Sequence, residues 1–121
     1  MTDFDTEAAT RAITSALAGP GGLGLVFTVF AGVPGVTRTP ARRSMFRSEP
    51  ERVQIGSWRY EVTGENRIRA GHVVGGIVLA EELLPAAGIA PHIARSLAEI
   101  VSSYGAAALP HLTAALEVLE G

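Results

Sequence analysis

The chain of 121 residues contains neither cysteine nor lysine. Without cysteine it has no disulfide, no thiolate nucleophile and no cysteine-based zinc or iron–sulfur site. Aromatic residues make up only 6% of the chain, with a single tryptophan, which is little material for the stacking platforms of single-strand nucleic-acid binders. No apolar run reaches the roughly 20 residues that span a bilayer, and the acidic start does not fit a secretory signal. We therefore expect a soluble, cytoplasmic protein.

What the chain does have is apolar material. Hydrophobic residues account for 47% of it and charged residues for 18%, a balance that favours a folded core over disorder. The length fits a single domain over residues 1–121. So much apolar surface would also suit an oligomer interface.

The charge is distributed unevenly along the chain. All ten basic residues are arginine, and eight of them lie between Arg38 and Arg69 together with four glutamates, which gives this stretch a formal charge of +4. The whole chain has a net charge of −2, so both flanks are acidic. The use of arginine without lysine resembles the composition of proteins from high-GC actinobacteria, a likeness that implies no active site.

The arginines are the first candidate site, because guanidinium groups pair with carboxylates and phosphates. We weigh three interpretations: a solvated loop whose arginines pair with nearby glutamates, a surface for an acidic protein partner, and a site for phosphate or RNA, with nucleic acid the least favoured. Thr39 and Ser44 follow basic residues as kinase sites do, and their phosphorylation is left open. The candidate residues for binding an anion or a partner are Arg38, Arg42, Arg43, Arg47, Arg52 and Arg59.

The second candidate site is a pocket formed by Trp58, Tyr60 and His72 on two paired strands, with Arg59 beside them. The competing interpretation is that these rings simply pack against a helix. Glu81 and Glu82 are adjacent, so on a strand they point to opposite faces and cannot share a proton; a cross-strand ion pair with Arg67 or Arg69 is the simpler expectation.

Other motifs carry little chemistry. The glycines of Gly19–Gly24 match GxGxxG, but they follow a helix instead of a strand and include a proline, so we interpret them as a linker. His72, His92 and His111 lack metal-binding spacing, and the latter two follow prolines as ordinary residues at helix starts. We expect no metal, no cofactor and no catalytic residue.

Periodicity predicts three helices. The first covers residues 5–18, where apolar residues recur at helical spacing before Gly19-Pro20. Two more close the chain, one opening at Pro91 and ending before Gly105, the other running from about residue 107 or 110 to 120. Residues 23–31 are equally consistent with a helix and with a buried strand.

Strands are predicted between these helices. Alternation predicts a strand over residues 53–63, a turn at 64–66, a returning strand at 67–74 and another at 77–84. Gly75-Gly76 is either a two-residue hairpin turn or a bulge. Residues 33–52 are interpreted as an irregular exposed arginine-rich loop. The predicted fold is α+β: a short antiparallel meander of about three strands packed against one N-terminal and two C-terminal helices.

The function expected from these observations is that of a non-enzymatic interaction or scaffold domain. Residues 73–84 are apolar on both faces for much of their length, so the face that the helices leave open needs a cover. A second copy of the chain would supply it, which predicts a homodimer. The alternative is a binder of an anionic ligand, either a phosphorylated small molecule or RNA, through residues 38–69.

Overall fold

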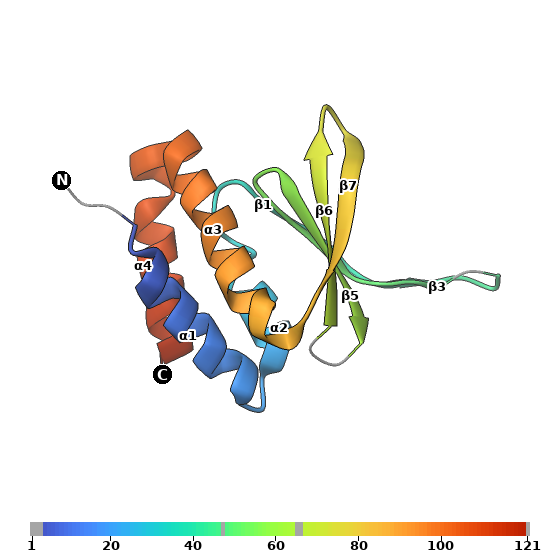
Figure 1. Cartoon of the computed structure of the whole chain (residues 1–121), viewed down its shortest axis with the longest axis horizontal. Coiled ribbons are helices and arrows are strands. Elements are labelled where there is room, and N and C mark those ends of the chain that lie inside the picture. Colours follow the sequence, from blue (N-terminus) through green and yellow to red (C-terminus); the bar gives the residue numbers. More distant parts are fainter. Residues whose placement is uncertain (1–3, 47, 65–66, 121) are drawn as a thin grey trace.

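The computed structural model describes residues 4–46, 48–64 and 67–120, and it has an α+β fold. Two N-terminal helices, a five-stranded antiparallel sheet and two C-terminal helices follow one another along the chain (Figure 1). The elements are α1 Thr6–Ala18, α2 Gly22–Phe30, β1 Val36–Thr39, β2 Arg42–Arg43, β3 Ser48–Glu49, β4 Arg52–Ile55, β5 Trp58–Gly64, β6 Arg67–Val74, β7 Ile77–Leu84, α3 Ala86–Tyr104, the short 3-10 helix η1 Gly105–Ala107 and α4 Leu109–Glu120.

The two N-terminal helices follow from local sequence. Asp5 caps α1, because its carboxylate accepts a hydrogen bond of 3.1 Å from the backbone N–H of Ala8. In α2 the buried residues recur at intervals of three and four: Leu23, Val26, Phe27 and Phe30. That spacing places them on one helical face, so the ambiguity at residues 23–31 is resolved as a helix.

The sheet has the strand order β1-β4-β5-β6-β7 with every pair antiparallel. The single strand predicted over residues 53–63 is wrong. Ile55 pairs with Trp58, so the chain reverses at Gly56-Ser57, where Gly56 has a positive φ of 61°. Gly75-Gly76 is a hairpin turn, since Val74 pairs with Ile77 and both glycines have positive φ. The meander thus has five strands instead of three.

The irregular loop predicted over residues 33–52 also needs correction. It contains β1, at the edge of the sheet, and a short hairpin of β2 and β3 that projects away from the rest of the molecule (Figure 1). We call residues 40–50 the arm. The candidate Arg47 lies outside the described residues, as do residues 65–66 of the predicted turn between β5 and β6.

The prediction for the first C-terminal helix placed its start too late. α3 begins at Ala86 and contains Pro91 within it. Because proline has no N–H to donate and its ring crowds the preceding turn, it usually marks a helix start, which explains the error. One consequence is that His92 lies well inside α3 and is buried.

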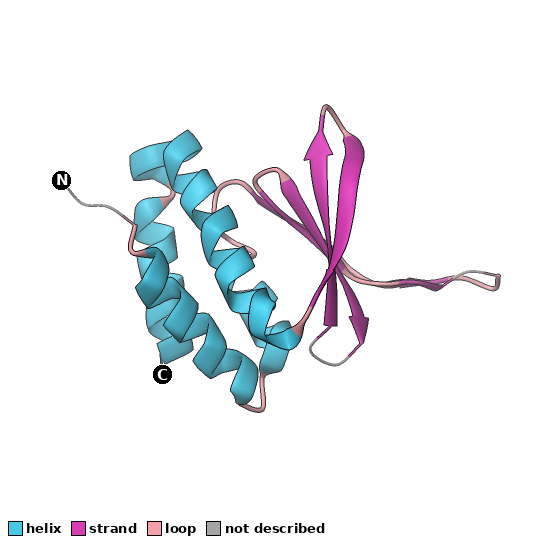
Figure 2. Ribbon diagram, in the orientation of Figure 1, coloured by secondary structure: helices cyan, strands magenta, loops and turns pink. Residues whose placement is uncertain are grey.

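All four helices lie on one side of the sheet (Figure 2). α3 contacts β4, β6 and β7, while α1 packs against α2, α3 and α4. The core fills the space between these layers. Within it, the rings of Phe27 in α2 and Tyr60 in β5 pack together with their centroids 6.4 Å apart. None of the helices in the described part of the chain covers the other face of the sheet. None of the described helices is both long and apolar enough to cross a membrane.

Candidate functional site

Tyr60, on the helix-facing side of β5, is the centre of a polar cluster inside the core. Its hydroxyl lies 2.7 Å from Nδ1 of His92 and also contacts Oγ of Ser96, with both partners on α3. Nε2 of His92 faces Oε1 of Glu82 at 3.5 Å. The arrangement fits a neutral imidazole: the tyrosine O–H donates to Nδ1, and Nε2–H points toward the carboxylate.

Burial controls the ionisation of this cluster. It raises the pKa of Tyr60 above its ordinary value, so the hydroxyl stays protonated and keeps its role as donor. Burial also lowers the pKa of His92, and the nearby Arg95 lowers it further, while Glu82 acts in the opposite direction. Both residues therefore stay neutral at physiological pH.

The carboxylate, imidazole and hydroxyl of this cluster have the order of a catalytic relay, but the relay has no access to substrate. Tyr60, His92 and Ser96 are buried, and a group that transfers a proton must come within hydrogen-bond reach of the reacting molecule. We assign the cluster a structural role, holding α3 against β5.

The predicted pocket residues lie close together at the edge of this cluster. Trp58 pairs with His72 across β5 and β6, and their rings stack with centroids 4.8 Å apart. The ring of His92 is perpendicular to that of the same tryptophan, and their centroids lie 4.5 Å apart. The rings pack on one another, and Arg59, one residue along, points to the opposite face of the sheet. Their role in ligand binding stays a prediction.

The structure distributes the candidate arginines over three places. Arg38 lies on the helix-facing side of β1, where its guanidinium binds Glu51 at 2.6 Å and Thr28 at 3.4 Å. Arg42 and Arg43 are exposed on the arm. Arg52 and Arg59 share a cavity on the uncovered face of the sheet. The sequence cluster is thus not one surface.

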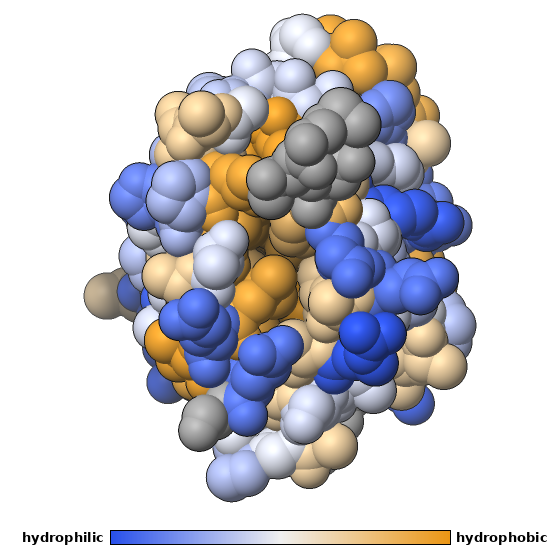
Figure 3. All heavy atoms as spheres, turned by 90° about the vertical axis from the view of Figure 1, so that its left-hand side faces the viewer, coloured by the Kyte–Doolittle hydropathy of each residue, from blue (hydrophilic) through white to orange (hydrophobic). Residues whose placement is uncertain are grey.

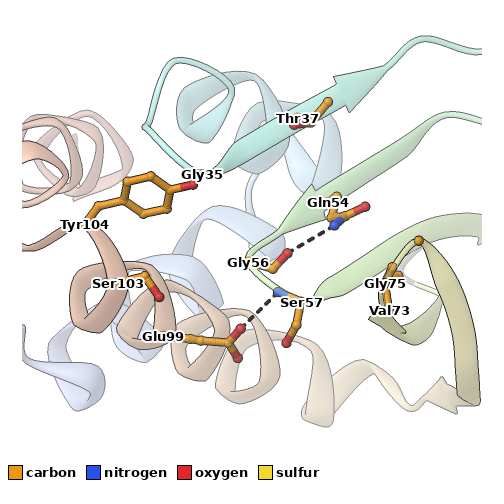
Figure 4. A pocket seen from close by; sticks show the side chains of 11 residues that line it. Gly35, Thr37, Gln54, Gly56, Ser57, Val73, Gly75, Glu99, Ser103 and Tyr104 are labelled. Carbon is orange, nitrogen blue, oxygen red and sulfur yellow. Dashed lines mark hydrogen bonds between the residues drawn. The ribbon is translucent and has the colours of Figure 1, made fainter.

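That cavity adjoins a larger one, and we call the two together the groove, with this cavity as its narrow end. The narrow end has a volume of 200 Å³ and is lined by Thr37, Thr39, Arg52, Gln54 and Arg59. Thr37 and Gln54 also line the larger cavity of 780 Å³, so the two cavities adjoin at these residues. The larger cavity is also lined by the C-terminal part of α3 and by the β6–β7 turn, and Figure 4 shows Glu99, Ser103 and Tyr104 on its α3 side and the β4–β5 turn beside them.

A hydrogen bond fixes the wall of the larger cavity. Oε1 of Glu99 accepts the backbone N–H of Ser57 at 2.9 Å, which anchors the β4–β5 turn to α3. The close approach explains why residue 56 is glycine: a Cβ there would lie 2.9 Å from the same carboxylate oxygen. On the sheet side, the amide of Gln54 donates to the carbonyl of Gly56 at 3.1 Å, drawn as a dashed line in Figure 4.

At the other edge of the sheet, β7 exposes apolar side chains. Leu79 and Leu83 have exposed fractions of 64% and 67%. Leu83 alternates with Leu84, which is buried beneath the helices, so Leu83 lies on the uncovered face. Leu79 is the extra residue at a bulge, because His72 pairs with Ala80 and Val73 with Val78. Glu81 lies between these two leucines, 3.9 Å from Arg69 of β6, a cross-strand ion pair of the kind predicted. This edge combines apolar groups with both signs of charge.

In the described part of the chain, no group of three or more histidine, aspartate or glutamate side chains is arranged to hold a metal ion. No curated protein and no solved structure shows significant similarity to the chain. A family model does match, over residues 1–121, and its description is "Domain of unknown function (DUF5073)". Because that match covers the full length, the chain belongs to the DUF5073 family.

Proposed function

We propose that the chain is a non-enzymatic interaction domain that acts as a homodimer through the uncovered face of its sheet at β6 and β7. The observation that supports this most directly is the exposure of Leu83 on that face, with Leu79 also exposed on the same strand. Large apolar side chains gathered at one edge of a sheet mark an interaction surface more often than an ordinary exterior. β7 also pairs with β6 alone, which leaves a strand edge available for pairing.

A second copy is the occupant that the charges favour. The uncovered face presents Arg69 next to Glu61 at 3.6 Å and next to Glu81 at 3.9 Å. A twofold axis brings the same surface patch of two copies together. A patch that holds both signs can then place each arginine opposite a carboxylate of the other copy, whereas a patch of one sign would repel itself.

The test is the mass in solution of three proteins: the wild type, Leu83→Asp and Val118→Asp. Val118 is the matched control, because it is a similarly exposed apolar residue, at 60%, and belongs to α4. The helices, α4 among them, lie on the side of the molecule that Figure 3 views. We expect native mass spectrometry to find the wild type and Val118→Asp as dimers and Leu83→Asp as a monomer. A monomeric wild type at high micromolar concentration, or dissociation by Val118→Asp alone, would overturn the proposal.

A second candidate function is the binding of an anionic ligand. It is favoured by the cavity that holds Arg52 and Arg59 on neighbouring strands, since a pair of guanidinium groups at one concave site attracts phosphate and carboxylate groups. Binding of this kind weakens as salt screens the charges. A wild-type protein that binds no small anion even at low salt would remove this candidate.

A further inference from the structure

The groove extends from β1, β4 and β5 to α3 and the β6–β7 turn, and it has two chemically different ends. The narrow end holds both guanidinium groups together with the hydroxyls of Thr37 and Thr39. At the wide end, one carboxylate, Glu99, lies among neutral polar groups and the half-exposed ring of Tyr104. A molecule that fills the groove therefore meets cations at one end and neutral or acidic groups at the other.

Strand register explains why the narrow end forms. Thr39 pairs with Arg52, and Gln54 pairs on one side with Thr37 and on the other with Arg59. Directly paired residues in antiparallel strands have their Cβ atoms about 4.5–5.5 Å apart on the same face. Five donor-bearing side chains from three strands thus converge on a cavity of 200 Å³.

The two arginines differ in how far the chain already uses them. Arg52 has contacts of its own within the chain. Arg59 forms no side-chain ion pair or hydrogen bond with any other described residue, and its cross-strand neighbours are the neutral Gln54 and Gly71. By contrast, Arg38 is neutralised by Glu51. Arg59 is therefore the arginine of the groove with the most capacity to bind an anion.

We propose that this groove binds a small phosphorylated molecule, with its phosphate between Arg52 and Arg59 and its uncharged, hydroxyl-bearing part in the wide end. Phosphate oxygens match the forked N–H groups of guanidinium and accept from threonine hydroxyls. Glu99 fixes the orientation, because its carboxylate repels phosphate and accepts hydrogen bonds from hydroxyls. This proposal rests on the second candidate function and is independent of the homodimer.

Isothermal titration calorimetry with inorganic phosphate, ribose and ribose 5-phosphate tests it. Two variants that remove the same charge separate the groove from the arm: Arg59→Gln and Arg43→Gln. We expect ribose 5-phosphate to bind more tightly than phosphate, and ribose not to bind measurably. Since a hydrogen-bonded charge pair contributes enough for about a tenfold change in affinity, Arg59→Gln should weaken binding about tenfold and Arg43→Gln by less than about twofold.

The outcomes separate the site from the function. Loss of binding in Arg43→Gln with retention in Arg59→Gln would overturn the groove while anion binding by the chain stands. Equal weakening in both variants would mean a diffuse electrostatic effect and would also overturn the groove. No binding of phosphate or ribose 5-phosphate by the wild type would overturn both. Circular dichroism of each variant confirms that it is folded, so that a loss of binding reports the site.

Discussion

Replacing Tyr60 with phenylalanine removes one oxygen atom from the core and leaves the rest of the packing in place. The ring would keep its contacts with the rings of Phe27 and His92, whose centroids lie 6.4 Å and 5.5 Å from its own. What changes is hydrogen bonding: Nδ1 of His92 and Oγ of Ser96 both lose the hydroxyl. The two losses differ in cost. Ser96 can instead donate to the carbonyl of His92, four residues earlier in α3, whereas Nδ1 of His92 is left without a donor.

The cost should therefore come mainly from one buried nitrogen without a partner. Leaving a buried polar group unsatisfied costs about 1–3 kcal/mol, so we expect Tyr60→Phe to lower the free energy of unfolding by that amount. In a domain of this size, each kcal/mol corresponds to about 2–8 °C in Tm. Urea denaturation followed by circular dichroism at pH 7 measures the difference, with an unchanged m-value.

Tyr104→Phe is the matched control for this measurement. Tyr104 is 50% exposed, so water can satisfy its hydroxyl and the same chemical change should alter the free energy of unfolding by less than about 0.5 kcal/mol. If the two substitutions had equal effects, the argument that the Tyr60 hydroxyl joins β5 to α3 would be refuted. Adding Ser96→Ala to Tyr60→Phe should cost less than the sum of the single changes, because both remove the same hydrogen bond.

Two further predictions concern pH and the β4–β5 turn. Burial lowers the pKa of folded His92 below its ordinary value near 6.5, so the unfolded chain takes up the proton first as pH falls. The contribution of His92 to the free energy of unfolding is therefore complete above about pH 6.5. Below that pH the free energy of unfolding should decline by at most about 1.4 kcal/mol per pH unit. Urea titrations between pH 5.5 and 7.5 measure this slope, and an equal slope in His92→Gln would contradict it. Gly56→Ala should destabilise the fold more than Gly75→Ala: both glycines have φ near 60°, but only the Cβ at residue 56 meets the Glu99 carboxylate. Either substitution forces an alanine into the left-handed region, which costs about 1–2 kcal/mol. Chemical denaturation should show an additional loss of about 1 kcal/mol for Gly56→Ala, because the new Cβ disturbs the hydrogen bond between Glu99 and Ser57. Equal losses in the two variants would rule out that effect of the Cβ on Glu99.

The α+β class, the first helix and the strands at 67–74 and 77–84 were predictable because each has a clear apolar period and terminating residues. The turn at Gly56-Ser57 was not, because apolar residues on both sides of it continue a strand pattern. There the deciding property is the positive φ of Gly56, which composition alone does not separate from a glycine within a strand. At residues 23–31 both periods were present, and only packing against the rest of the core selected the helix.

The candidate site, too, could be predicted from the sequence only in part. Tyr60 was a candidate, but its partner His92 lies 32 residues away and was assigned to an ordinary helix start because Pro91 precedes it. The available signal was the need of a buried tyrosine hydroxyl for a partner, which no local pattern could connect to α3. Likewise the arginines cluster in one stretch of the sequence, whereas strand alternation places Arg38 on one face and Arg52 and Arg59 on the other.

The two proposals rest on different residues of the sheet: the phosphate site on Arg52 and Arg59 of β4 and β5, and the dimer on the exposed residues of β6 and β7. The strand order places Arg59 on the central strand β5 with the narrow end of the groove toward β1, and Leu83 at the far edge on β7. A dimer formed through β6 and β7 therefore leaves the narrow end of the groove open. Leu83→Asp should accordingly give a monomer that still binds ribose 5-phosphate with unchanged affinity, and Arg59→Gln should leave the dimer intact. Coupling between the two measurements would mean that the dimer covers the groove, because linkage is reciprocal between binding equilibria.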